Sequence, residues 1–180
     1  MYPARLPDGR IKPPFGPPDC PWKSVSPGSS ISENAVEFGK LNGDQVYIGR
    51  VYDNDCWLIG TAVPSKGVCH YLSRNAELKS TDSYDVLTCD CGNPLEFESP
   101  DFESNLLFVA GGNEDHCLYA ARVVDGENTY IGWVDKKIRV ANLPRDPSVG
   151  PNQVKENFGV LNHKLLDRLC VCPMPPPYSY

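Results

Sequence analysis

The sequence lacks several features that mark large classes of proteins. None of its 180 residues lies in an apolar run approaching the ~18 to 20 residues of a membrane-spanning helix. The N-terminus continues into Pro- and Gly-rich polar sequence without the apolar core of a signal peptide. No asparagine stands in an Asn-x-Ser/Thr glycosylation acceptor. We therefore expect a soluble protein with no membrane span and no signal peptide.

Positive charge is also scarce, with 17 Lys and Arg against 23 Asp and Glu, for a net charge of −6. Phosphate neutralisation drives non-specific nucleic-acid binding, so no nucleic-acid partner is expected. The sequence has no phosphate-binding glycine loop, Gly-x-Ser-x-Gly elbow or His-Glu-x-x-His motif. Adjacent residues of a strand point to opposite faces, so neither Cys69-His70 nor His116-Cys117 can form a nucleophile–base pair within its own dipeptide. From these absences we expect that the protein is not an enzyme and uses no cofactor.

Cysteine is present in an even number, eight residues, which in a secreted chain would suggest disulfides. Without a signal peptide we expect free thiols. Two Cys-x-Cys pairs, Cys89/Cys91 and Cys170/Cys172, are a weaker match to a zinc site, because a structural zinc knuckle normally spaces its cysteines further apart. We therefore expect no metal.

Proline is concentrated at the two ends. Residues 1–27 are expected to form an irregular Pro-rich arm, and 169–180 a Pro-rich tail. The tail contains a PPxY-like stretch, Pro175 to Tyr178, which fits the aromatic groove of a WW-type domain. A solvated tail is the alternative interpretation, and we favour it.

The segment between the ends repeats itself. Val46–Val51 reappears 72 residues later as Leu118–Val123, and the same offset aligns Ile59-Gly60 with Ile131-Gly132. After a two-residue insertion, Tyr84–Leu87 aligns with Phe158–Leu161. We place one repeat at 28–100 and the other at 101–168, together forming one globular domain.

Each repeat alternates β-branched or aromatic residues with others and carries turn signals, which predicts short strands joined by hairpins. The turn signals are Asn42-Gly43, Asp53-Asn54, Ser65-Lys66-Gly67 and Asp125-Gly126. The segment 162–169 has helical leucine spacing but is short enough to be a strand. The predicted fold is all-β, with two antiparallel β-meander repeats packed about a pseudo-twofold axis.

The order and spacing of these elements resemble the tandem DM-nine repeat family. The matching residues in the first copy are Ala35–Gly39, Val46–Arg50, Ile59-Gly60 and Tyr84–Leu87. The resemblance implies a small antiparallel protein of an invertebrate, related to mannose-binding lectins of innate immunity that act as pattern-recognition molecules. It also implies homodimerisation, and a cytoplasmic or vesicular location with release, if any, by a non-classical route.

In the family, sugar is bound by a lysine in a Pro-Gly-Lys turn and by an acidic residue in the turn before the Tyr-x-Gly-Arg strand. This chain has Thr61 and Trp133 at the two lysine positions. Thr61 can hydrogen-bond, and Trp133 can stack on a sugar ring. The acidic turns are kept. The candidate carbohydrate-binding residues are Lys40, Asp44, Thr61, Asn113, Glu114 and Trp133. Each polar one is also typical of a solvated turn.

Arg50 and Arg122 occupy the Gly-Arg position of the two copies. A structural role is favoured, in which the stem packs on the sheet and the head pairs with a carboxylate. Two functions remain open for the chain as a whole. One is a non-enzymatic, mannose-type carbohydrate-binding protein whose partners are glycans or microbial polysaccharide. The other is an intracellular or vesicle-associated protein-interaction or stress-response protein that has lost the sugar site.

Overall fold

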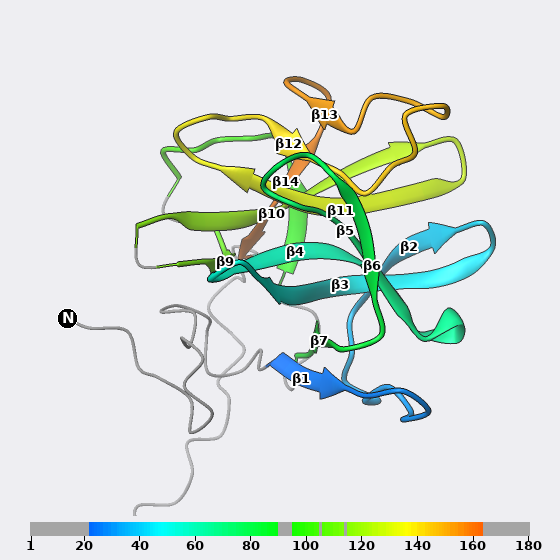
Figure 1. The fold of residues 1–180 in the computed structure, drawn as a ribbon. Coiled ribbons are helices and arrows are strands. Elements are labelled where there is room, and N and C mark those ends of the chain that lie inside the picture. Colours follow the sequence, from blue (N-terminus) through cyan, green and yellow to red (C-terminus); the bar gives the residue numbers. More distant parts are fainter. Residues whose placement is uncertain (1–21, 90–94, 105, 114, 164–180) are drawn as a thin grey trace, which may run out of the picture.

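A computed structural model describes residues 22–89, 95–104, 106–113 and 115–163. These residues form an antiparallel all-β fold, as the alternation in the sequence predicts (Figure 1). The only helical turn among them is a 3-10 turn, η1, at Pro64–Lys66. The strands are β1 Trp22–Val25, β2 Glu37–Leu41, β3 Asp44–Asp53, β4 Cys56–Val63, β5 Val68–Leu72, β6 Leu78–Thr81, β7 Tyr84–Leu87, β8 Leu95–Glu98, β9 Val109–Gly112, β10 Cys117–Asp125, β11 Asn128–Asp135, β12 Ala141–Asn142, β13 Gln153–Val154 and β14 Gly159–His163.

The hairpin turns lie where the sequence predicts them. The β2–β3 turn uses Asn42 and Gly43, which both have positive φ, at 51° and 86°. This is the backbone of a type I′ turn, whose twist matches that of the paired strands. Asn54 and Asp55 give the β3–β4 turn the same positive φ values, 48° and 59°. Local turn chemistry thus sets the register of the long β3–β4 hairpin.

The two repeats have the same strand pairing. In the first, β7 pairs with β1 and β3, and β4 pairs with β3 and β5. In the second, β14 pairs with β8 and β10, and β11 pairs with β10 and β12. Gly49 lies opposite Val86, and their counterparts Ala121 and Val160 also lie opposite one another. The pairing therefore confirms the repeat alignment and its two-residue insertion, whereas the twofold axis stays a prediction.

Two short strands lie outside the repeat boundaries expected from the sequence. β1 falls within the predicted 1–27 arm, yet it pairs with β7 of the first repeat. β8 precedes residue 101, yet it pairs with β14 of the second. Of the expected tail and the 162–169 segment, only Asn162 and His163 are described, and both belong to β14. The Pro175–Tyr178 motif lies outside the described residues.

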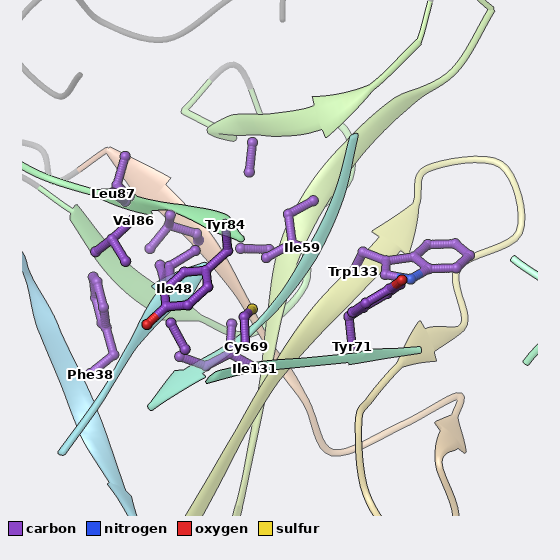
Figure 2. Close-up of a cluster of buried hydrophobic side chains, with 14 of the residues drawn as sticks. Phe38, Ile48, Ile59, Cys69, Tyr71, Tyr84, Val86, Leu87, Ile131 and Trp133 are labelled. Atoms are coloured by element: carbon purple, nitrogen blue, oxygen red, sulfur yellow. The ribbon is translucent and has the colours of Figure 1, made fainter. Parts of the chain in front are cut away.

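Most of the core forms one cluster between the repeats, and Figure 2 shows part of it. The fully buried side chains come from both copies, including Ile48 and Ile59 of the first and Ile131 of the second. Strand β4 is buried along its whole length because other strands cover both of its faces. A second, smaller cluster lies within the second repeat around Val134 and Val160. Burial of one repeat's apolar face against the other makes them a single unit.

The repeat arginine is held differently in the two copies. Arg50 donates from Nε to Asp85 Oδ2 at 2.9 Å, and its guanidinium carbon lies 4.6 Å and 4.3 Å from the ring centroids of Trp22 and Trp57. Arg122 stacks on Phe97 at 4.7 Å, the counterpart of Trp22. The predicted carboxylate pairing holds for Arg50, and the contact of its head with two indoles is an addition to the prediction. Arg122 has no carboxylate partner among the described residues, because its repeat has Gly159 where the first has Asp85.

The cysteines described include three free thiols, Cys56, Cys69 and Cys117. Burial raises the pKa of Cys56 to about 11 and raises that of Cys69 as well. A thiol with a raised pKa stays protonated at neutral pH and is a poor nucleophile or metal ligand. Within the described ranges, no group of His, Cys, Asp and Glu is arranged to hold a metal ion.

We expect His70 to make the stability pH-dependent. Its Nδ1 lies 2.7 Å from Ser80 Oγ, and burial lowers its pKa below the usual 6.5. The unfolded chain therefore takes up this proton first, so stability should fall as pH decreases through about 6.5. His70→Asn introduces the residue found at the equivalent position 142. Urea unfolding from pH 7 downward should show a flatter pH dependence for the variant. Parallel curves for the two proteins would contradict this assignment.

Candidate functional site

A groove with a volume of about 390 Å³ lies beside Trp133. Its lining combines an aromatic ring, two aliphatic side chains, two amides, one carboxylate and two cations. The lining residues are Arg74, Trp133, Asp135, Ile138, Val140, Asn142, Gln153 and Lys155. Arg74 follows β5 of the first repeat, whereas the others come from the second, so the groove lies where the repeats meet.

Trp133, in β11, is fixed by a contact between the repeats. Its indole Nε1–H donates to the carbonyl oxygen of Leu72, the last residue of β5, at 2.8 Å. The residue is only 7% exposed, so most of the ring is packed in the core and a limited part faces the groove. Figure 2 shows the indole near Tyr71, which also belongs to β5. The ring is thus a rigid wall rather than a mobile side chain.

The amides of the groove form an ordered pair. Asn142 donates from Nδ2 to the carbonyl oxygen of Val140 at 2.9 Å and accepts from Gln153 Nε2 at 2.8 Å. The side-chain carbonyl of Gln153 receives no hydrogen bond within the part of the chain that the structure describes. An amide fixed on one side with an acceptor left over is suited to a ligand hydroxyl.

The carboxylate of the groove is already engaged. Asp135 Oδ2 lies 3.2 Å from His116 Nδ1, and Oδ1 accepts the backbone N–H of Lys137 at 2.7 Å. The charges of Arg74 and Asp135 both act on Cys56, whose pKa is raised by burial, lowered by Arg74 and raised further by Asp135. These two groove residues therefore lie within electrostatic reach of the same thiol.

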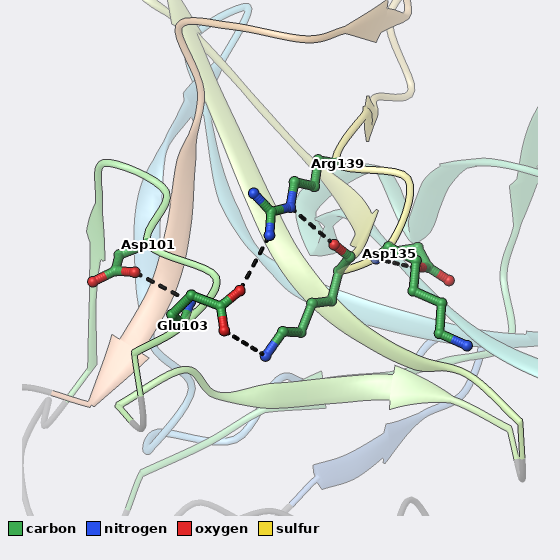
Figure 3. A network of polar contacts seen from close by, with 6 residues as sticks. Asp101, Glu103, Asp135 and Arg139 are labelled. Carbon is green, nitrogen blue, oxygen red and sulfur yellow. Dashed lines mark hydrogen bonds and ion pairs between the residues drawn. The ribbon is translucent and has the colours of Figure 1, made fainter.

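The two cations of the groove differ from Asp135 in their contacts with the residues that the structure describes. Arg74 and Lys155 are both exposed. Neither makes a hydrogen bond or an ion pair with any described residue. The nearby β11–β12 loop is different, because Lys136 and Arg139 both reach Glu103, at 3.8 Å and 3.1 Å (Figure 3). Between them the loop presents Ile138, which is 68% exposed, to solvent at the side of the groove.

Of the residues predicted to bind sugar, Trp133 lines the groove, and the Asn113 turn adjoins it. Asn113 Oδ1 accepts the N–H groups of Asp115 and His116, each at 3.0 Å. This turn holds His116 against Asp135 of the groove. Glu114 lies outside the described residues.

Lys40 and Asp44 lie at the β2–β3 hairpin and do not line the groove. Lys40 is exposed. Asp44 accepts the hydroxyl of Ser65 at 2.8 Å and lies 3.7 Å from Lys66 Nζ. The structure therefore does not bring these two residues together with Trp133.

Thr61 has a different surrounding from its counterpart Trp133, because it is fully buried. Its Oγ1 accepts the backbone N–H of Ile131 and donates to the carbonyl oxygen of the same residue, both at 2.8 Å. The hydroxyl thus bridges β4 of the first repeat to β11 of the second. It is committed to the fold and is not presented to solvent.

Sequence reasoning missed Arg74, Gln153 and Lys155. They come from two separate segments, Arg74 from the loop after β5 and the other two from β13 and the residue that follows it, and no local motif joins them. The strand pairing makes Gln153 the counterpart of Ser80, since Asn142 pairs with Gln153 as His70 pairs with Ser80. The sequence offset alone does not give this equivalence, and the place of Arg74 depends on how the repeats pack.

The fold and the groove define an all-β protein of two joined repeats with a ligand-sized site at their junction. The DM9 repeat family matches residues 40–148, so this chain belongs to the DM9 repeat family. No curated protein is significantly similar to the chain. Among the described residues, no helix is long and apolar enough to cross a membrane.

The fold is also similar to the crystal structure of the nematode sperm cell motility protein MFP2B. The TM-score is 0.60 at 18% sequence identity, over 89% of this chain and 50% of that one. This chain thus spans about half the length of that protein. At this identity the likeness shows the shared fold alone.

Proposed function

We propose that the protein is a non-enzymatic carbohydrate-binding protein whose site is the groove beside Trp133. The supporting observation is the combination at one place of an immobile indole, an amide acceptor on Gln153 and cationic donors. A pyranose offers both an apolar C–H face and hydroxyls that donate and accept, and this lining matches both. The DM9 family membership agrees with such a role, through the lectins that the family includes. We extend the proposal to a recognition role in invertebrate innate immunity.

At this groove, residues other than the lysine expected in the family would donate hydrogen bonds to the sugar. Trp133 occupies the lysine position of the second repeat and offers the limited part of its indole that faces the groove as an apolar contact. Arg74 and Lys155 supply the charge-assisted hydrogen bonds that a lysine would make. The first repeat contributes Arg74 rather than a second, equivalent site, since Thr61 is buried there.

The test is to fill the groove. Val140→Tyr places a bulky ring among the lining residues, and Val124→Tyr, at an exposed position of β10, is the matched control. A glycan array identifies the ligand, starting with mannose-type glycans, and titration calorimetry measures it. We expect Val140→Tyr to weaken binding by roughly tenfold or more, which is about 1.4 kcal/mol, and Val124→Tyr to leave it unchanged. If Val140→Tyr and Val124→Tyr bind equally well, the groove is not the carbohydrate site.

A second candidate function is a protein-interaction role inside the cell or on vesicles. The buried Thr61 favours it, because the first repeat uses its sugar-donor position to hold the second repeat. A glycan array without any binding would support this second candidate over the first.

A further inference from the structure

Two positive charges of the groove are not paired with a carboxylate among the described residues. Arg74 and Lys155 line the groove and make no ion pair with any residue that the structure describes. This is notable in a chain of net charge −6, in which carboxylates outnumber cations. Elsewhere the arginine Arg50 and the lysine Lys79 do have carboxylates, at 2.9 Å and 3.3 Å.

The carboxylate of the groove forms no ion pair with either cation among the residues described. Both oxygens of Asp135 are engaged, one with His116 and one with a backbone N–H. Because the residue is 7% exposed, little of it remains accessible to a ligand or a cation. The charge of Asp135 offsets one of the two cations, and the lining is left with an excess of one positive charge.

A planar guanidinium and an ammonium are the side chains that recognise carboxylate oxygens, since they form charge-assisted hydrogen bonds. A small inorganic anion would use these two groups and leave the indole of Trp133 and the carbonyl of Gln153 without a role. A sugar ring that carries a carboxylate uses all four. Its C–H face would contact the part of the indole that faces the groove, a hydroxyl would donate to the side-chain carbonyl of Gln153, and the carboxylate would bind the cations.

We infer that the groove selects an acidic saccharide, a hexuronate-type sugar with a carboxylate, over the neutral sugar of the same stereochemistry. This inference rests on the proposed function, because it names the ligand class of the same site. Mannuronate is mannose oxidised to the carboxylate at C6, so the pair of sugars differs by the one group that the cations would recognise, and mannose-type glycans are the neutral ligands of the proposed function.

The experiment compares oligomannuronate with neutral manno-oligosaccharides of equal length by titration calorimetry at low and high salt. We expect the acidic oligomer to bind at least tenfold more tightly at low salt, with a preference that salt weakens. Arg74→Gln and Lys155→Gln should each reduce affinity for the acidic oligomer roughly tenfold. Both residues are exposed, so both variants should fold, which thermal unfolding verifies.

Lys23→Gln is the matched control, because it removes one exposed positive charge from β1, outside the groove. It should bind like the wild type; if it weakens binding as much as the groove variants do, overall charge is responsible and the inference fails. Equal affinity for acidic and neutral oligomers would overturn the inference but leave the proposed function intact. No binding of either would overturn both. A polyglutamate peptide that binds as tightly as oligomannuronate would overturn the assignment to a saccharide.

Discussion

Replacing Asp85 by alanine is expected to lower the free energy of unfolding by about 3 to 5 kcal/mol, the usual cost of removing one member of a buried ion pair. The side chains of Arg50 and Asp85 are only 8% and 9% exposed, so water cannot replace the lost carboxylate. The guanidinium is also confined between two indoles and has little room to reach solvent. Urea unfolding at pH 7 measures the loss.

Glu103→Ala is the matched control for this prediction. It removes the carboxylate that Lys136 and Arg139 reach, but Glu103 is 75% exposed. Exposed ion pairs contribute at most about 1 kcal/mol, so this variant should be close to the wild type. The double variant Arg50→Met with Asp85→Ala should recover part of the stability, because it removes the buried positive charge as well. If Asp85→Ala and Glu103→Ala lower the free energy of unfolding equally, the buried Arg50–Asp85 pair contributes no more to stability than an exposed ion pair.

Replacing Thr61 by valine is expected to destabilise the protein almost as much. Valine keeps the shape but removes the hydroxyl that both accepts from and donates to the backbone of Ile131. Each buried polar group left without a partner costs about 1 to 3 kcal/mol. Thr61→Val removes the partner of two such groups, the N–H and the carbonyl oxygen of Ile131. The neighbouring pairing with β12 does not compensate, because it involves Trp133 and Val134 only.

Thr61→Ser keeps the hydroxyl and loses one methyl group, so it should cost only about 1 kcal/mol. Amide hydrogen exchange gives a local measurement, since the N–H of Ile131 should exchange faster in Thr61→Val than in Thr61→Ser. A slow Ile131 amide in Thr61→Val would show that this backbone group finds another partner.

Much of the fold follows from local sequence. The Asn42-Gly43 turn and the alternation of β3 specify a hairpin, and the 72-residue offset specifies that it occurs twice. The offset also shows which residues of the two copies are equivalent, since Gly49 and Ala121 hold corresponding places in the strand pairing. These features depend on neighbours in the chain or on self-similarity, and both can be read without a structure.

The parts that were missed depend on contacts between the repeats. Trp57 pairs with Gly112, and Thr61 reaches Ile131, across long separations that no local pattern encodes. The groove also depends on contacts between the repeats, because Arg74 of the first repeat lines it together with residues of the second. The predicted boundaries put β1 in the N-terminal arm and β8 in the first repeat, because strands of four residues carry little periodic signal. In the structure each places an aromatic ring on the repeat arginine, Trp22 on Arg50 and Phe97 on Arg122.

The different surroundings of positions 61 and 133 have a consequence for valency. Two equivalent sites on one chain would allow a single molecule to bridge two glycans. Here position 133 faces a groove, whereas position 61 is sealed by Ile131 on the partner repeat. If the groove is the carbohydrate site, one chain binds ligand with a stoichiometry of one. Agglutination of glycan-coated particles would then require association of chains, so a particle-clumping assay would report on dimerisation in addition to sugar recognition.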